Sequence, residues 1–211
     1  TLIMKKNYPD LPYVLIGHSM GSYMSRKYAS IYGDELDGVI FLGTGNQPKA
    51  VVDSGLKLAH IAKLVRGERY RSELLNTIMF GAYNKRIKDN RTANDWLTKD
   101  TKIVDEYLSD PKCSYKFTAN AYIGFLNVIK YDIDKKNIAK TPDKLPVLFA
   151  SGLEDPVGDY GKGVKKAFKM YTKYVDNVEL YLYEDDRHEL HSETDREDIF
   201  SDLYEWIEEN V

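Results

Sequence analysis

The chain has 211 residues, of which 43% are hydrophobic and 30% are charged, with 14 glycines and 7 prolines. A chain of this size and composition is neither collagen-like, disordered nor of low complexity, and it can bury a core as one compact domain without disulfide or metal crosslinks. Its 30 basic and 33 acidic side chains are well mixed and give a net charge of -3, so nucleic acid is not an expected partner.

The first elements along the chain are the end of a helix and a buried strand. Residues 1–7 place two lysines and an asparagine shortly before Pro9, as in the last turn of a helix, so the sequence is expected to begin within a helix. Residues 13–16 form a near-continuous apolar run, typical of a parallel strand that is covered on both faces and has neighbours on both sides. Because one such neighbour would precede residue 1, we interpret the chain as the C-terminal part of a longer protein whose N-terminal strands are missing here.

A tight turn and a helix follow that strand. The segment 17–21 reads Gly-His-Ser-Met-Gly and leads into a helical stretch that ends at Gly33. Met24, Tyr28 and Ile31 lie on one face of this helix. Strand, turn and helix in this order form the first unit of an α/β fold.

Further strands and helices continue the alternation. Two continuous apolar runs predict buried parallel strands, and a third run alternates apolar and polar side chains, as a half-exposed edge strand does. These strands cover residues 39–42, 147–150 and 178–183. Helical periodicity predicts helices over residues 162–174 and 196–210, the second with a capping box of Thr194 and Glu197. We therefore expect an α/β fold with a doubly wound, mostly parallel sheet.

The stretch between the second and third strands does not follow this alternation. It is mostly helical, because its apolar residues recur on amphipathic stretches that are broken at glycine, asparagine and proline. An insertion of this length is either a lid over a ligand site or a packed decoration. We expect a first core part at residues 1–45, a helical lid or cap at residues 46–144, and a second core part at residues 145–211.

The main chemical signal is the pattern Gly17-x-Ser19-x-Gly21. A strand ends, the serine lies on a sharp turn that only flanking glycines permit, and a helix begins. Such a turn lifts the hydroxyl clear of its backbone and directs it at the helix N-terminus. There the Met20 N–H and the helix dipole can stabilise a developing oxyanion. The alternative is a tight structural turn without chemistry.

A serine nucleophile needs a general base, normally a histidine held by a carboxylate. His18 adjoins the serine but faces along the turn, and His60 lies inside a predicted insertion helix, so both are expected to be packing or rim residues. His188 follows the last strand at the same sheet edge as Ser19, and we prefer it to His191 as the base. His188 and His191 are spaced i, i+3, whereas zinc-binding histidines of zincins are spaced i, i+4, so a metal site is not expected.

The acid that orients the base is expected at the end of the preceding strand, where Glu154 and Asp155 lie. Asp155 is the better candidate because Pro156 fixes its backbone in a turn, although a solvated loop charge is the alternative. The resulting chain order of Ser19, Asp155 and His188 is the serine-acid-histidine order of α/β-hydrolases.

Together these motifs resemble those of α/β-hydrolases of the monoacylglycerol lipase and lysophospholipase type, a group also catalogued with serine aminopeptidases. The resemblance covers essentially the whole chain and rests on three segments and on lid-like stretches of the insertion. They are Gly-His-Ser-Met-Gly-Ser at 17–22, Gly-Leu-Glu-Asp-Pro-Val-Gly at 152–158, Arg-His-Glu at 187–189 ahead of Glu193, and the insertion residues 91–92, 95–97 and 110–111, which look like the lid of bacterial members.

The resemblance implies an α/β-hydrolase fold and a role for each matching residue. Ser19 is then the nucleophile, His188 the base, Asp155 the acid, and Met20 one oxyanion donor through its N–H. The family's second oxyanion donor comes from a His-Gly loop after an early strand, and this sequence contains no such loop.

Three hypotheses for function follow. The first is a serine hydrolase that forms an acyl-enzyme with a small lipophilic ester, such as a monoacylglycerol or a lysophospholipid. Aromatic side chains of the lid favour it, although they could instead form the lid's own core; they are Phe80, Trp96, Phe117, Tyr122 and Phe125. The second is an aminopeptidase, which would need Glu73, Asp95 or Glu106 to hold the substrate's amino group. The third is a non-catalytic binding protein, which would have no use for a complete triad.

The remaining expectations concern partners and location. The single cysteine, Cys113, excludes an internal disulfide and suits a reducing compartment. No apolar run approaches the ~18 residues of a membrane span, so we expect no stable membrane insertion and a cytoplasmic location. We expect no cofactor and no metal ion. The exposed edge of the strand at 13–16 would pair with other chains, so the chain alone is expected to form homo-oligomers, to aggregate or to need the upstream segment.

Overall fold

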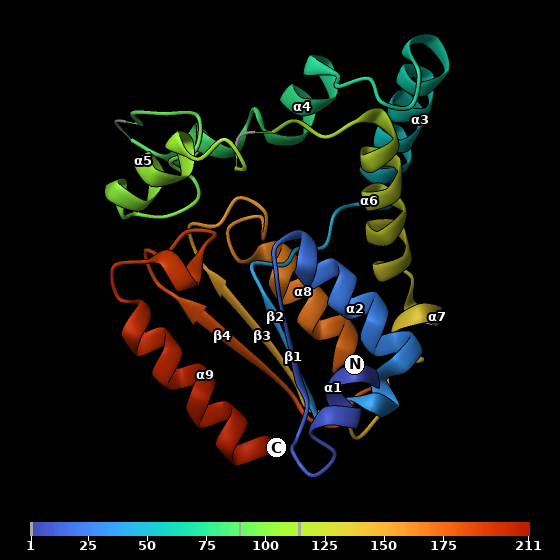
Figure 1. Cartoon of the computed structure of the whole chain (residues 1–211), viewed down its shortest axis with the longest axis vertical. Coiled ribbons are helices and arrows are strands. Elements are labelled where there is room, and N and C mark those ends of the chain that lie inside the picture. The colour runs from blue at the N-terminus through green and yellow to red at the C-terminus, as the bar shows by residue number, and fades with distance from the viewer. Residues whose placement is uncertain (1, 89, 114) are drawn as a thin grey trace.

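The computed structural model describes residues 2–88, 90–113 and 115–211; Thr1, the first residue of the predicted opening helix, lies outside the described residues. Within them, one parallel sheet has the strand order β1-β2-β3-β4 (Figure 1). The strands are β1 (Val14–His18), β2 (Gly38–Leu42), β3 (Val147–Gly152) and β4 (Val178–Tyr183). The expected parallel α/β sheet is therefore confirmed, with each strand within two residues of its predicted bounds.

The four strands differ in how far they are buried. Every residue of β2 and β3 is buried, and every residue of β4 is half-buried, as predicted for an edge strand. β1 differs from the expectation of a strand that is covered on both faces. Ile16 is 49% exposed, and among the described residues β1 pairs with β2 only. β1 therefore forms the second edge of the sheet that the structure describes.

Helices cover both faces of this sheet (Figure 1). They are α2 (Met20–Tyr32), α8 (Lys162–Tyr171) and α9 (Arg196–Asn210), with short 3-10 turns η1 (Gly33–Glu35) and η3 (Leu190–Ser192). The opening helix α1 (Leu2–Asn7) has no buried residue. Side chains of a strand alternate between its two faces. Val39 and Phe41 of β2 accordingly join the cluster with α2 and α8, and Ile40 and Leu42 join the cluster with α9.

Helix α2 presents to the core a face that matches its apolar spacing only in part. Of the predicted face, Tyr28 packs against the core, but Met24 is 46% and Ile31 is 48% exposed. The buried positions are Tyr23, Arg26 and Ala29. Arg26 can lie there because its guanidinium donates to the carbonyl oxygens of residues 45 and 132 at 2.8 and 3.0 Å. A count of apolar residues does not detect a buried face that is built around a cation.

Two predicted helix ends are also corrected. Helix α8 ends at Tyr171, three residues earlier than expected, because the backbone turns there and Thr172 caps it. The capping box of Thr194 and Glu197 does not form. The cap residue of α9 is Asp195, which makes no side-chain capping bond. The 3-10 turn η3 ends at Ser192, and α9 begins at Arg196, one residue beyond the start that the box requires.

The helical insertion joins β2 to β3. Its elements are α3 (Lys49–Arg66), α4 (Glu73–Phe80), η2 (Tyr83–Arg86), α5 (Thr101–Ser109), α6 (Ala119–Asp132) and α7 (Lys135–Ile138). Helices α3, α4 and α5 lie beyond the carboxyl ends of the strands, whereas α6 and α7 run back alongside α2 (Figure 1). α3 and α6 pack on each other through Val52, Leu56, Leu126 and Ile129, a cluster that also contacts Tyr23 of α2. In the part of the chain that the structure describes, no helix is long and apolar enough to cross a membrane.

Candidate active site

Ser19 occupies the turn between β1 and α2 in a strained backbone conformation, with φ 54° and ψ -122°. Non-glycine residues seldom adopt a positive φ, and such strain persists only where the surrounding structure enforces it. Here the Ser19 N–H donates to the carbonyl oxygen of Leu42 at 3.0 Å, and the Ser22 N–H and hydroxyl donate to the Ser19 carbonyl at 2.9 and 2.6 Å. The turn is thus held from the neighbouring strand and from the first turn of the helix.

The two glycines of the turn have different surroundings. A Cβ at Gly17 would lie 2.3 Å from Ser25 Oγ and 2.6 Å from the Gly21 carbonyl oxygen, so a larger residue does not fit. A Cβ at Gly21 would meet no atom of residues 2–88, 90–113 and 115–211 within 4 Å. The expectation that both glycines are sterically required is therefore confirmed at Gly17 and wrong at Gly21 for the described residues.

The structure brings Ser19, His188 and Asp155 together from three separate loops. His188 Nε2 lies 2.7 Å from Ser19 Oγ, and His188 Nδ1 lies 3.1 Å from Asp155 Oδ1. Both the imidazole and the carboxylate are buried. A proton on Nδ1 that is directed at the carboxylate leaves the Nε2 lone pair facing the serine hydroxyl. This arrangement can withdraw the hydroxyl proton as the oxygen attacks an electrophile.

Further contacts fix the carboxylate. Asp155 Oδ1 accepts a hydrogen bond from the Val157 N–H at 2.8 Å, and Ser151 Oγ donates to Asp155 Oδ2 at 3.5 Å. Glu154, the other acid considered for this position, is exposed. The structure therefore aligns Asp155, and not its neighbour, with the imidazole.

His18 contacts the loop of His188 more closely than its expected packing or rim position implies. Its Nε2 lies 3.1 Å from the His188 carbonyl oxygen, and the two rings are 4.8 Å apart. Burial lowers the pKa of His18 to about 3, so this ring is neutral near neutral pH and donates one N–H to that carbonyl. His60 is exposed on α3, and His191 is exposed on η3. The position of His18 next to Ser19 in the sequence does not predict this hydrogen bond to the His188 carbonyl.

Gly43 is a second feature that sequence reasoning did not assign to the site. It follows β2 with φ 56°, and a Cβ there would lie 3.0 Å from both His188 Cε1 and the His188 carbonyl oxygen. Only glycine gives the imidazole this room in this backbone conformation. The sequence feature that could have indicated this role is the position of Gly43 directly after the second predicted strand.

The predicted oxyanion donor lies at the start of α2. Met20 is the first residue of this helix, so its N–H has no acceptor within the helix. The positive end of the helix dipole lies at the same point. The backbone beside Ser19 can therefore stabilise negative charge on a neighbouring oxygen.

The aromatic side chains of the insertion divide between the site and the insertion's own core. The Trp96 ring lies 5.0 Å from the His188 ring and contacts Tyr83 at 4.8 Å. Phe117 and Tyr122 lie 5.6 Å apart, in a cluster with α3 and α4. Trp96 is thus beside the imidazole, whereas Phe117 and Tyr122 stabilise the insertion itself.

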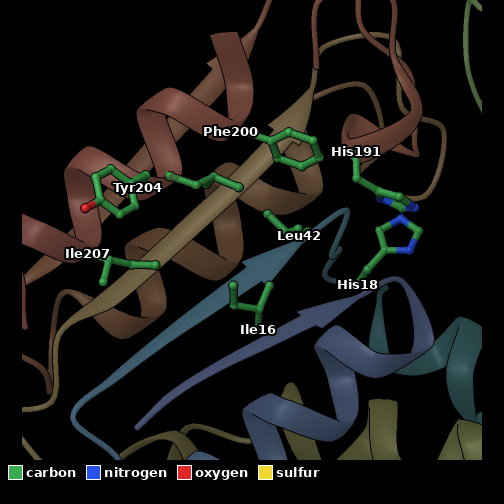
Figure 2. A pocket seen from close by; sticks show the side chains of 8 residues that line it. Ile16, His18, Leu42, His191, Phe200, Tyr204 and Ile207 are labelled. Carbon is green, nitrogen blue, oxygen red and sulfur yellow. The ribbon is translucent and has the colours of Figure 1, made fainter. Parts of the chain in front are cut away.

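A mainly apolar cavity of about 490 Å³ opens between the β1 edge and α9 (Figure 2). Its lining residues are Ile16, His18, Leu42, His191, Phe200, Leu203, Tyr204 and Ile207. At one end the rings of His18 and His191 lie 4.7 Å apart. The cavity thus ends at His18, the residue before Ser19, on the face of the sheet that α9 covers, and Trp96 is not among its lining residues.

The chain is similar to known proteins over most of its length. A protein-family model described as serine aminopeptidase, S33, matches residues 1–195. A monoglyceride lipase homolog of Monkeypox virus is 22% identical over 206 residues, which make up 97% of this chain and 66% of that protein.

Solved structures with the same fold are also similar in sequence. A carboxyl esterase from Bacillus coagulans has a TM-score of 0.91 and 28% identity, covering 99% of this chain and 68% of that one. A lipase in an open form has a TM-score of 0.84 and 29% identity, covering 95% of this chain and 66% of that one. A monoglyceride lipase variant from Saccharomyces cerevisiae shares the fold with a TM-score of 0.72 at 20% identity, covering 100% of this chain and 66% of that one. This chain therefore spans about two thirds of the length of these proteins.

Proposed function

The chain belongs to the S33 serine aminopeptidase family of hydrolases, as its motifs predict, and on this premise we propose that it cleaves carboxylic esters with Ser19, His188 and Asp155 as its triad. The observation that carries the proposal is one buried imidazole that bridges a hydroxyl at 2.7 Å and a carboxylate at 3.1 Å. A tight turn needed only for structure would not require this alignment. A non-catalytic binding protein would not require it either.

The proposed reaction passes through an acyl-enzyme. Ser19 Oγ attacks the ester carbonyl carbon while its proton moves to His188 Nε2. The carbonyl oxygen takes up negative charge and faces the Met20 N–H and the N-terminus of α2. His188 then gives the proton to the leaving alcohol as the carbon–oxygen bond of the ester breaks. Asp155 stays ionised and stabilises the imidazolium; water later releases the acid by the same proton transfers in reverse.

The proposed substrates are lipophilic esters of the monoacylglycerol or lysophospholipid kind. Support comes from the Trp96 ring beside His188, and from its neighbours Tyr83 and Phe80, which together give the site an aromatic surface from the insertion. An acyl chain can bury apolar area against such rings. We include residues 46–144 in the proposal as a cap over the site, between the two core parts 1–45 and 145–211.

The structure gives no support to the aminopeptidase alternative. It requires an acid near the site that is free to hold a substrate's amino group. Glu73 and Glu106 are exposed, and Glu73 pairs with Lys116. Asp95 already accepts hydrogen bonds from the Arg91 N–H and from the backbone and hydroxyl of Thr92. Two of the three predicted acids are thus already engaged, and no contact joins the exposed Glu106 to Ser19 or His188 among the described residues, so ester hydrolysis is favoured.

A fluorophosphonate probe tests the proposal directly because it bonds covalently to an activated serine. We expect the intact mass of the protein to rise by one adduct, and we expect this adduct to be lost in Ser19→Ala. Ser54→Ala, at an exposed position of α3, is the matched control and should label normally. Turnover of p-nitrophenyl monoesters should exceed turnover of aminoacyl-p-nitroanilides. Undiminished labelling of Ser19→Ala, or faster turnover of the anilides, would contradict the proposal.

A further inference from the structure

A buried carboxylate next to the base loop has no role in the mechanism above. Glu193 lies five residues after His188, ahead of α9, and its side chain is completely buried. Its Oε1 accepts from the Arg187 N–H at 2.7 Å. Its Oε2 accepts from Thr98 Oγ1 and from the Lys99 N–H, both at 2.9 Å. Three donors from two distant segments therefore converge on one carboxylate.

The two segments are also paired through their backbones. The Glu189 N–H donates to the carbonyl oxygen of Leu97 at 2.7 Å, and the His188 N–H donates to that of Trp96 at 3.4 Å. The bonds involve the base itself and the residue after it. Residues 95–99 of the insertion thus form a short backbone ladder with the loop that carries the imidazole.

Charged side chains add further bonds between the His188 loop and residues 95–99. Arg187 Nη1 donates to the carbonyl oxygens of Asp95 and Thr98 at 2.6 and 3.0 Å. Lys99 Nζ lies 2.5 Å from the buried carboxylate of Asp186. Both residues that precede His188 are therefore anchored to the same stretch of the insertion.

Resting on the proposed function, we propose that Glu193 is a positioning residue that holds His188 in reach of Ser19 by fixing the base loop against residues 95–99. A buried carboxylate without donors is unfavourable, and each hydrogen bond to a charged group is stronger than a neutral one. The residues between β4 and α9 form no strand and only the short turn η3, so no long regular element of this loop holds His188 in place. The Glu193 contacts supply that constraint, and they make the insertion part of the machinery that orients the base.

Glu193→Gln tests this because it keeps the size of the side chain and replaces one acceptor oxygen by an NH₂ group. Whichever way the amide turns, the NH₂ group faces a backbone N–H, of Arg187 or of Lys99, and the loop must shift. A displacement near 1 Å lowers turnover on the order of 100-fold, so we expect kcat to fall about 10- to 100-fold. KM should change less than about threefold, because the surface that faces the substrate is unaltered. Glu197→Gln, the same change at an exposed position of α9, is the control.

Active-site titration separates positioning from folding. The fluorophosphonate counts competent sites, and kcat for a p-nitrophenyl monoester is then expressed per titrated site. A merely structural role would lower the number of sites, whereas a positioning role lowers the turnover of each site. Thr98→Val removes one donor and should lower turnover per site more mildly, and Thr98→Ser, which keeps the hydroxyl, should restore it. This pair decides the question if Glu193→Gln does not fold.

The failures of the two proposals are distinguishable. Wild-type turnover per site in both Glu193→Gln and Thr98→Val, with normal loss of labelling in Ser19→Ala, would overturn the positioning role alone. Absence of labelling in the wild-type protein, or labelling that survives Ser19→Ala, would overturn the proposed function and the positioning role with it.

Discussion

Gly17→Ala and Gly21→Ala form a matched pair that tests how the serine turn is held. The two glycines flank the same residue, and each substitution adds one methyl group. At Gly17 the new Cβ would lie 2.6 Å from the Gly21 carbonyl oxygen, whereas ordinary van der Waals contact begins at 3.4 Å, so the backbone of the turn must move by about 0.8 Å. At Gly21 the new Cβ enters open space among the described residues.

The magnitudes follow from these distances. A shift of this size at the nucleophile lowers kcat on the order of 100-fold, and the overpacking costs about 1–3 kcal/mol of unfolding free energy. Gly21 lies within α2, where replacing glycine by alanine stabilises a helix by about 0.5–1 kcal/mol, so Gly21→Ala should retain turnover and unfold at a slightly higher temperature.

Turnover of a p-nitrophenyl monoester, the rate of fluorophosphonate labelling and thermal unfolding together measure the outcome. A third variant sharpens it: adding Ser25→Ala to Gly17→Ala removes the 2.3 Å contact with Ser25 Oγ but leaves the backbone contact, so turnover should stay low. Equal losses in Gly17→Ala and Gly21→Ala, or full recovery in the double variant, would refute this steric account.

Two further predictions concern stability and association. Burial raises the pKa of Asp132 to about 7 from an ordinary value of 3.8, so the folded state binds a proton that the unfolded state has released, and stability should fall as pH rises from about 4 to 7. Asp132→Asn should flatten this slope in urea unfolding measured at several pH values, and an unchanged slope would count against it. Ile16 is 49% exposed on the edge strand β1, so the chain alone should self-associate in light scattering, and Ile16→Lys should reduce association while Ile61→Lys on α3 should not. A monodisperse wild-type monomer would contradict the second prediction.

The features that sequence predicts well here are those with a local cause. A continuous apolar run and a strict alternation already distinguish the buried strands β2 and β3 from the half-buried β4. The position of Ser19 follows from a strand, a glycine turn and a helix within a few residues of one another. His188 and Asp155 follow because the carboxyl ends of parallel strands meet at one edge of the sheet.

Features that depend on distant partners were predicted poorly. The buried face of α2 could not be read from its apolar residues, because the Arg26 guanidinium is stabilised there by hydrogen bonds to backbone carbonyls that lie 19 and 106 residues away. The capping box of Thr194 and Glu197 fits the local pattern, yet α9 begins one residue later than this box requires, after the turn η3. In the first case distant acceptors, and not the local apolar spacing, decide which face of the helix is buried.

The contact that is proposed to hold the base could not be predicted from a sequence motif. Glu193 and Thr98 are 95 residues apart, and most of the acceptors around them are backbone carbonyls, which every residue type has. Such contacts do not depend on residue type, so a motif can identify His188 as the base but cannot identify the segment that orients it. If residues 95–99 hold the base loop in this way, the insertion cannot be exchanged freely as a lid, because any replacement must reproduce these carbonyl positions to within the sub-ångström tolerance of the Ser19–His188 hydrogen bond.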